Sequence, residues 1–260
     1  MKEWDATAYH RLSGPQTAWG ERILAQLELR GDETVLDAGC GTGRLTEKLL
    51  ERLPRGRVIA LDASTEMLRA ARANLERFGD RVSFLEADLS ELDLDGAVDV
   101  VFSTATFHWV LDHGRLFANL YRALRQDGRL VAQCGGGPNT KGVMERVHTV
   151  MALPSFAPYF EGYVDPWEFA DAATAAARLA TAGFKDVETH LVEAPTVFED
   201  ERTYWEFLEK VILRVQIERL PEDLRTPFLD EVVGRVPRPL VIDYWRLNLF
   251  GRKILTARAT

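Results

Sequence analysis

Short apolar runs alternate with longer amphipathic segments along the first two-thirds of the chain. The runs are rich in Val, Ile and Leu, as buried strands are, whereas the longer segments carry apolar residues at three- and four-residue spacing, which is typical of helices facing a core. The pattern predicts five strands, at 34–37, 57–62, 82–86, 98–102 and 129–133, and three helices, at 44–53, at 64–78 and ending at 126–128.

The last third of the chain has a different pattern. It predicts an alanine-rich helix over 170–182, a strand over 186–193, two helices over 199–234 that are broken near Pro221, and a last strand over 240–250. Because these two helices lie between strands, they are predicted to be an insertion and not an independent domain. The alternation of strands and helices predicts an α/β fold with a doubly wound, mostly parallel sheet, whose ligands bind at the carboxyl ends of the strands.

Composition narrows the class of protein. The chain has 260 residues, 46% of them hydrophobic and 28% charged, and a net charge of −8, which fits a globular protein and argues against nucleic acid as a partner. Cys40 and Cys134 are too few for a disulfide framework or a four-cysteine zinc site, and no metal is expected. No apolar run has the length of a membrane span, and the first residues do not resemble a signal peptide. We therefore expect a cytoplasmic protein, a monomer or a homodimer, without a membrane partner.

A glycine-rich turn follows the first strand. Gly39, Gly41 and Gly43 stand between this strand and the next helix, where glycine lets a ligand approach the backbone. A dinucleotide fingerprint would need Gly or Ala where Arg44 stands, and no Gly-Lys-Ser/Thr follows that would mark a P-loop. Asp37 would repel a pyrophosphate and attract an ammonium group. The turn therefore indicates a ligand with an ammonium group.

Two further carboxylates follow the second and third strands. Asp62, at the end of the second strand, can accept hydrogen bonds from both hydroxyl groups of a ribose, and Asp88, after the third, can accept an amino hydrogen of adenine. Each of them alone could instead cap a helix or a turn. Together with Asp37 and the glycine-rich turn, they fit a nucleoside with a cationic amino-acid tail, which is S-adenosylmethionine (SAM).

These motifs resemble those of class I SAM-dependent methyltransferases, and the resemblance covers almost the whole chain. It implies a Rossmann-like sheet of seven strands, with the last strand antiparallel, in a single domain over 1–260. Within that domain it implies N-terminal cap helices over 1–30, a SAM-binding core over 33–135 and a helical insertion or lid over 199–234. SAM is then the methyl donor and S-adenosylhomocysteine (SAH) the product. The residues expected to bind SAM are Asp37, Gly39, Cys40, Gly41, Asp62, Ala63, Met67, Ala87, Asp88, Leu89 and Ser103.

Two segments resemble those of the trans-aconitate methyltransferase-like subgroup, which includes carboxyl O-methyltransferases. They are 4–9, which in that group caps the bound SAM, and 103–110, which borders the methyl group and the substrate. The resemblance implies in-line displacement onto a small molecule, and it favours the carboxylate of an organic acid as the acceptor. The expected substrate contacts are Tyr9, Trp109 and Arg246. Of these, Arg246 would bind a carboxylate, because a guanidinium can donate two parallel hydrogen bonds to it.

Three alternatives remain open from the sequence. An N-, C- or phenol O-methyltransferase would need a base, and His108 is the candidate catalytic residue. A protein of this kind could also bind SAM without catalysis. An NAD-dependent oxidoreductase is disfavoured by Arg44. His108 could serve only in local packing, and Arg246 could be solvated or paired with an acid.

Overall fold

A seven-stranded sheet forms the centre of the molecule. The structure is a computed structural model, and it describes residues 14–254. The strands lie in the order β3-β2-β1-β4-β5-β9-β6. They are β1 (Thr34–Ala38), β2 (Arg57–Asp62), β3 (Val82–Glu86), β4 (Val98–Thr104), β5 (Leu124–Gly135), β6 (Lys185–Glu193) and β9 (Trp245–Arg252). β9 is antiparallel to both of its neighbours, so the predicted mostly parallel sheet with an antiparallel last strand is confirmed.

Helices cover both faces of this sheet. α2 (Gly14–Gln26), α3 (Arg44–Glu51) and α4 (Thr65–Leu75) share a core with Val35 of β1, whereas α5 (His113–Ala123) and α7 (Ala172–Ala182) share another core with Leu36. Adjacent residues of one strand thus face opposite layers, as the two-residue period of a strand requires. Strands buried on both faces read as continuous apolar runs, which is why the sequence showed them clearly. Within 14–254, no helix is long and apolar enough to cross a membrane.

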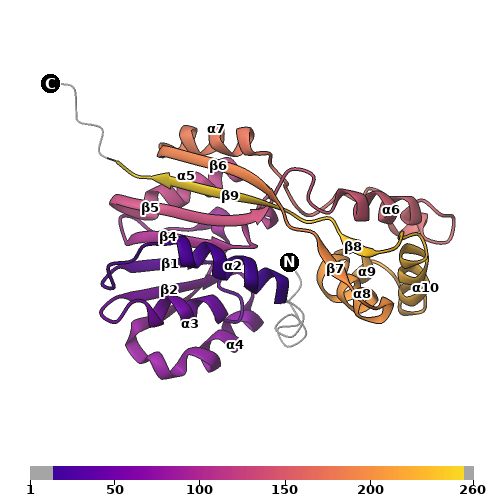
Figure 1. The fold of residues 1–260 in the computed structure, drawn as a ribbon, viewed down its shortest axis with the longest axis horizontal. Helices are drawn as coiled ribbons and strands as arrows, with labels where there is room; N and C mark the ends of the chain where they lie inside the picture. The colour runs from indigo at the N-terminus through magenta and orange to yellow at the C-terminus, as the bar shows by residue number, and fades with distance from the viewer. Residues whose placement is uncertain (1–13, 255–260) are drawn as a thin grey trace.

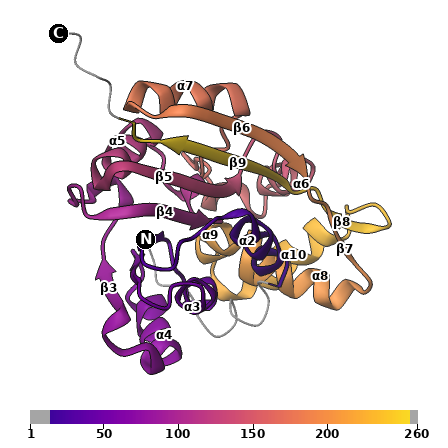
Figure 2. The ribbon, with the colours of Figure 1, turned by 60° about the vertical axis from the view of Figure 1, so that its left-hand side comes forward.

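A second group of helices lies beyond the end of the sheet toward which β5 points, on the right in Figure 1. We call it the helical lobe. It consists of α6 (Lys141–Met151), α8 (Glu201–Phe207), a π-helical turn (Leu208–Ile212), α9 (Arg214–Glu218), α10 (Glu222–Val233) and the two-stranded sheet of β7 (Thr196–Phe198) and β8 (Leu240–Ile242). The lobe has a hydrophobic core of its own, to which α2 contributes Trp19. α2 therefore joins the sheet to the lobe, and Figure 2 shows it between them.

Four details of the fold differ from the sequence pattern. The strand predicted over 240–250 is two strands, because the chain leaves the small sheet at Asp243 and joins the large sheet after it. There the Asp243 carboxylate accepts a hydrogen bond from the backbone N–H of Gly142 (2.7 Å) at the start of α6, a helix that the pattern did not predict. Pro221 does break the helices of 199–234, but a second break at Leu213 makes three of them. The helix predicted to end at 126–128 ends at Ala123, where β5 begins.

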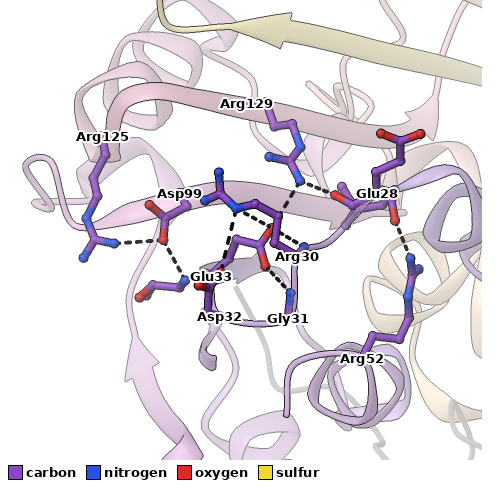
Figure 3. A network of polar contacts seen from close by, with 11 residues as sticks. Glu28, Arg30, Gly31, Asp32, Glu33, Arg52, Asp99, Arg125 and Arg129 are labelled. Carbon is purple, nitrogen blue, oxygen red and sulfur yellow. Dashed lines mark hydrogen bonds and ion pairs between the residues drawn. The ribbon is translucent and has the colours of Figure 1, made fainter. Parts of the chain in front are cut away.

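A polar network joins the amino ends of β1 and β4 and the middle of β5 (Figure 3). The buried carboxylate of Glu33 accepts hydrogen bonds from the backbone N–H groups of Arg30 (2.8 Å) and Gly31 (2.9 Å), and lies 3.7 Å from the guanidinium of Arg129. Burial alone would raise the pKa of Glu33, but these hydrogen bonds and Arg129 hold it below its usual value. This network lies at the end of the sheet opposite the carboxyl ends of the parallel strands.

Candidate functional site

A pocket opens at the carboxyl ends of β1 to β4 and is closed on its far side by the helical lobe. This is the place where a doubly wound sheet binds its ligands. The lining residues come from the loops after these strands, from α2, from the segments on either side of α6, from the π-helical turn and from the start of β9. They are Gln16, Gly39, Gly41, Leu61, Asp62, Ala63, Ser64, Met67, Ala87, Asp88, Leu89, Thr104, Ala105, Thr106, His108, Trp109, Val110, Asn139, Thr140, Trp167, Phe169, Val211, Ile212, Tyr244 and Arg246.

The glycine-rich turn forms one wall of the pocket. The N–H groups of Gly39 and Cys40 both donate to the carbonyl of Leu61 (2.8 Å each), which fixes the turn against β2. Gly39 has a φ of +85°, and a Cβ there would lie 2.1 Å from the hydroxyl of Thr106. A side chain would be strained by this φ and would also clash with Thr106, so the fold requires glycine at this position. Gly41, also at positive φ, has open space where a Cβ would stand, so a ligand can approach its backbone.

Asp62 lies at the end of β2 with its carboxylate held in place by two backbone groups. One oxygen accepts from the N–H of Gly41 (2.9 Å) and the other from the N–H of Ser64 (3.0 Å). A carboxylate oxygen can accept more than one hydrogen bond, so these backbone contacts are compatible with a ribose hydroxyl as a further donor. Asp88 caps the short 3-10 turn Leu89–Glu91 through the N–H of Ser90 (2.8 Å), and it lines the pocket as well. For Asp88, capping and ligand contact are therefore compatible.

The pocket between these two acids is apolar. Ala63, Met67, Ala87 and Leu89 line it, and Met67 and Leu89 are buried. Two carboxylates that flank an apolar slot, next to a backbone left open at Gly41, match the polar edges and flat ring of an adenosine group. The residues present therefore fit SAM, and Gly39, Gly41, Asp62, Ala63, Met67, Ala87, Asp88 and Leu89 would hold it.

Three residues predicted to bind SAM do not line the pocket. Asp37 is 2% exposed and accepts a hydrogen bond from the hydroxyl of Thr46 (2.6 Å), so it supports the turn from beneath. Burial raises the pKa of Asp37 to about 7. Ser103 donates to the carbonyl of Ala38 (2.6 Å), behind the same wall. The third is Cys40, which is buried within the glycine-rich turn. Neither Cys40 nor Cys134 forms a disulfide, and burial raises the pKa of both thiols.

His108 lies in a short 3-10 turn after β4 and lines the pocket. Its Nδ1 accepts a hydrogen bond from the backbone N–H of Gly135 (3.3 Å). Burial first, and then the positive field of Arg246, lower the pKa of His108 well below its usual value, so the ring is neutral at pH 7. A neutral imidazole whose Nδ1 is an acceptor carries its proton on Nε2. In this tautomer His108 offers an N–H donor at Nε2, whereas the lone pair on Nδ1 is engaged by Gly135 and is not available to act as a base.

Arg246 brings a positive charge into the same pocket. It is only 4% exposed, and its guanidinium lies over the ring of Trp19, 4.7 Å from the centroid. Trp19 also packs edge-on against Tyr244, whose hydroxyl accepts from Gln16 (3.3 Å). Helix α2 thus positions the charged part of the pocket. Of the predicted substrate contacts, Trp109 and Arg246 line the pocket, and Tyr9 lies outside the described residues.

Several lining residues carry no signal in the sequence. Trp167, Phe169, Val211 and Ile212 come from segments far from the SAM motif, and their apolar side chains would suit any core. Ala105 and Thr140, in the lining, have φ values of 57° and 55°, a conformation that side chains rarely adopt. Such strain is concentrated at functional sites, but it is visible only in the structure.

The comparisons with known proteins agree with this geometry. A family model described as a methyltransferase domain matches residues 35–128. A trans-aconitate 2-methyltransferase of Azoarcus sp. (strain BH72) is 38% identical over 133 residues, 51% of each chain. The aligned part thus spans about half the length of this relative. One of Methylobacterium nodulans is 30% identical over 203 residues, 78% of this chain and 72% of that protein. The phosphoethanolamine N-methyltransferase 2 of Haemonchus contortus, solved with phosphomonomethylethanolamine and SAH, has the same fold, with a TM-score of 0.62 and 20% identity over 96% of this chain and 57% of that one.

Proposed function

The chain belongs to the class I SAM-dependent methyltransferases, in the subgroup of the trans-aconitate 2-methyltransferases, and we propose that it transfers a methyl group from SAM to the carboxylate of a small organic acid. One observation supports the choice of acceptor. The buried guanidinium of Arg246 and the neutral ring of His108 line the same pocket as Asp62 and Asp88. A cation and a hydrogen-bond donor suit an anionic oxygen.

When bound, SAM supplies a methyl group on a positively charged sulfur. In the proposed transfer, an acceptor oxygen forms a bond to the methyl carbon while the carbon–sulfur bond breaks, and the electron pair of that bond stays on sulfur. The products are a methyl ester and SAH. A carboxylate is ionised at pH 7, so no proton has to be removed. Among the lining residues within 14–254, His108 is the candidate base, and a proton on its Nε2 is consistent with such an acceptor.

The work of the protein is then to orient the acceptor and to exclude water. Arg246 would bind the carboxylate, and the Nε2–H of His108 would donate to one of its oxygens. The lobe residues Val211 and Ile212 would cover the acceptor, so the insertion 199–234 would serve as a lid within the same domain. The predicted contribution of Tyr9 and the rest of the N-terminal segment stays a prediction.

The test is transfer of labelled methyl groups to a panel of carboxylic acids, phenols and amines. We expect label in a product that mild alkali cleaves to methanol, as it does a methyl ester. Label in an alkali-stable product would contradict the carboxylate assignment and favour a phenol or amine acceptor. Binding of SAM in calorimetry without transfer to any member of the panel would favour a non-catalytic SAM-binding protein.

Arg246→Lys provides the matched variant. Lysine keeps the positive charge but cannot reproduce the planar, two-pronged contact of a guanidinium. We expect the KM for the acid to rise about tenfold, with the Kd for SAM within about twofold of the wild type. An unchanged KM would remove Arg246 from the acceptor site.

A further inference from the structure

The acceptor end of the pocket has an aromatic wall. His108, Trp109, Trp167 and Phe169, which we call the aromatic quartet, contact one another in a closed ring. The centroid distances are 5.4 Å for His108–Trp109 and 5.7 Å for each of the other three pairs. The backbone N–H of Glu168 donates to the carbonyl of His108 (2.9 Å), which ties the two segments together. All four rings line the pocket.

The lobe supplies a second apolar surface to the same pocket. Val211 and Ile212 line it, and both belong to the π-helical turn Leu208–Ile212. The N–H of Leu213 donates to the carbonyl of Leu208 (2.8 Å), which closes this wide turn. Single π-helical turns within helices are frequent at functional sites, because they change which side chains a helix presents. Here the turn presents two branched aliphatic side chains to the acceptor.

The charges of the pocket are unevenly distributed. Asp62 and Asp88 lie at the SAM end. Among the lining residues within 14–254, Arg246 is the one Lys or Arg, and the polar groups Gln16, Asn139, Thr140 and Tyr244 are uncharged. The described lining thus supplies one cation for a carboxylate. A second or third carboxylate on the acceptor would find no further Lys or Arg in that lining, and an unpaired charge beside its aromatic and aliphatic side chains is disfavoured.

We propose that the acceptor is a monocarboxylic acid with an aromatic or extended aliphatic body. Its carboxylate binds Arg246 and the Nε2–H of His108, and its body lies between the aromatic quartet and the π-helical turn. This proposal rests on the proposed function and specifies its substrate class. The proposed acceptor also differs from the one in the name of the relatives, since trans-aconitate carries three carboxylates and no apolar body.

Aromatic rings can also bind cations, which would suit an amine acceptor. The position of Arg246 argues against this use of the quartet. Its positive field is strong enough to contribute to the lowered pKa of His108, a member of the quartet, and it would repel an ammonium group in the same way. The rings are therefore assigned to apolar contact.

The first test measures binding separately from catalysis. The full chain is saturated with SAH and titrated in a calorimeter with 3-phenylpropanoate, acetate, trans-aconitate and 3-phenylpropylamine. We expect 3-phenylpropanoate to bind on the order of 10- to 100-fold more tightly than acetate, because it buries a phenyl ring. We also expect it to bind at least about tenfold more tightly than trans-aconitate. Tighter binding of trans-aconitate, or of 3-phenylpropylamine, would overturn the proposal.

The second test places an uncharged polar group on the apolar surface. Ile212→Asn should weaken the binding of 3-phenylpropanoate about tenfold or more, while SAH binds within about twofold of the wild type. Val197→Asn is the matched control, since Val197 lies on β7, exposed and outside the pocket lining. Trp167→Leu, which removes one ring and adds no polar group, should weaken binding in the same direction. Unchanged affinity in both pocket variants would overturn the proposal. Failure of the proposed function would look different, because the acid would bind and no ester would form.

Discussion

Asp62 holds two backbone N–H groups at the wall of the pocket, and we expect the same carboxylate to bind SAM. Its carboxylate orients the N–H groups of Gly41 and Ser64, and it faces the pocket. Asp62→Ala should weaken the binding free energy of SAM by about 2–4 kcal/mol, because it removes charge-assisted hydrogen bonds to the ligand and loosens the turn. Calorimetry on the folded variant measures this. Glu86→Ala, an exposed acid at the end of the neighbouring strand, should leave the Kd within about twofold.

His108 can be tested through its two nitrogen positions. In His108→Gln the side-chain amide can replace the Nε2–H donor, whereas in His108→Asn it can replace only the Nδ1 acceptor for Gly135. We expect the Gln variant to keep turnover within about tenfold and the Asn variant to lose more. Because burial and Arg246 hold the pKa of His108 well below its usual value, its titration should not affect the rate near neutrality, and the wild-type rate should be flat from about pH 6 to 9. A rate that rises through a histidine-like pKa, with a loss of 100-fold or more in the Gln variant, would make His108 a base.

Asp37 is expected to make the free energy of unfolding depend on pH in the absence of ligand. Burial raises its pKa to about 7, so between about pH 4 and 7 the folded chain keeps a proton that the unfolded chain has lost. The free energy of unfolding contributed by this group therefore falls as pH rises through that window, by up to about 4 kcal/mol, and is constant above it. Asp37→Asn should remove this slope, which urea titrations at several pH values measure. If the free energy of unfolding depended on pH in the same way in the wild type and in Asp37→Asn, Asp37 would be ionised throughout this pH range.

Local motifs allowed one end of the pocket lining to be predicted at the level of elements. Gly39, Asp62 and Asp88 each lie at the end of a strand that the apolar pattern marks or just after it, and the carboxyl ends of parallel strands meet at one edge. The acceptor end was not predictable in this way. Trp167 and Ile212 reach the pocket only through packing of the helical lobe, which no local pattern encodes. Asp37 and Ser103 lie at the correct edge but support the wall from behind, because a motif places a residue without fixing what its side chain contacts.

The network of Figure 3 also acts between secondary-structure elements, since it joins three strands at the end of the sheet away from the pocket. Glu33→Gln should lower the free energy of unfolding by about 1–3 kcal/mol, because the buried carboxylate accepts two backbone hydrogen bonds and lies near Arg129. The Kd for SAM should not change. Asp32→Asn is the control, since its contact with Arg30 is exposed and should contribute under about 0.5 kcal/mol. Equal loss in both variants would show that the network adds nothing specific.

At the scale of the whole molecule, the pocket lies where the sheet, with a core on each face, meets the helical lobe, which has its own core. The end of the pocket where we propose that SAM binds lies on the sheet, whereas Val211, Ile212 and Tyr244 belong to the helical lobe or its core. Trp19 of α2 packs in the core of the lobe, while Ile23 and Leu24 of the same helix pack on the sheet. SAH and the acid together should therefore strengthen the contact between sheet and lobe. Each alone should act mainly on its own part of the molecule, SAH on the sheet and the acid on the lobe.

Hydrogen exchange can separate these two effects. SAH alone should slow exchange in 39–43 and 62–68, and at 100 times its Kd it should stabilise the fold by about 2.7 kcal/mol, which corresponds to a rise in Tm of roughly 5–10 °C. Adding 3-phenylpropanoate should then slow exchange in 167–169 and 208–213. The polar variant Ile212→Asn should keep the first effect and lose the second. Protection of the lobe by SAH alone, unchanged by the acid, would mean that the lobe closes on the cofactor and takes no part in recognising the acceptor.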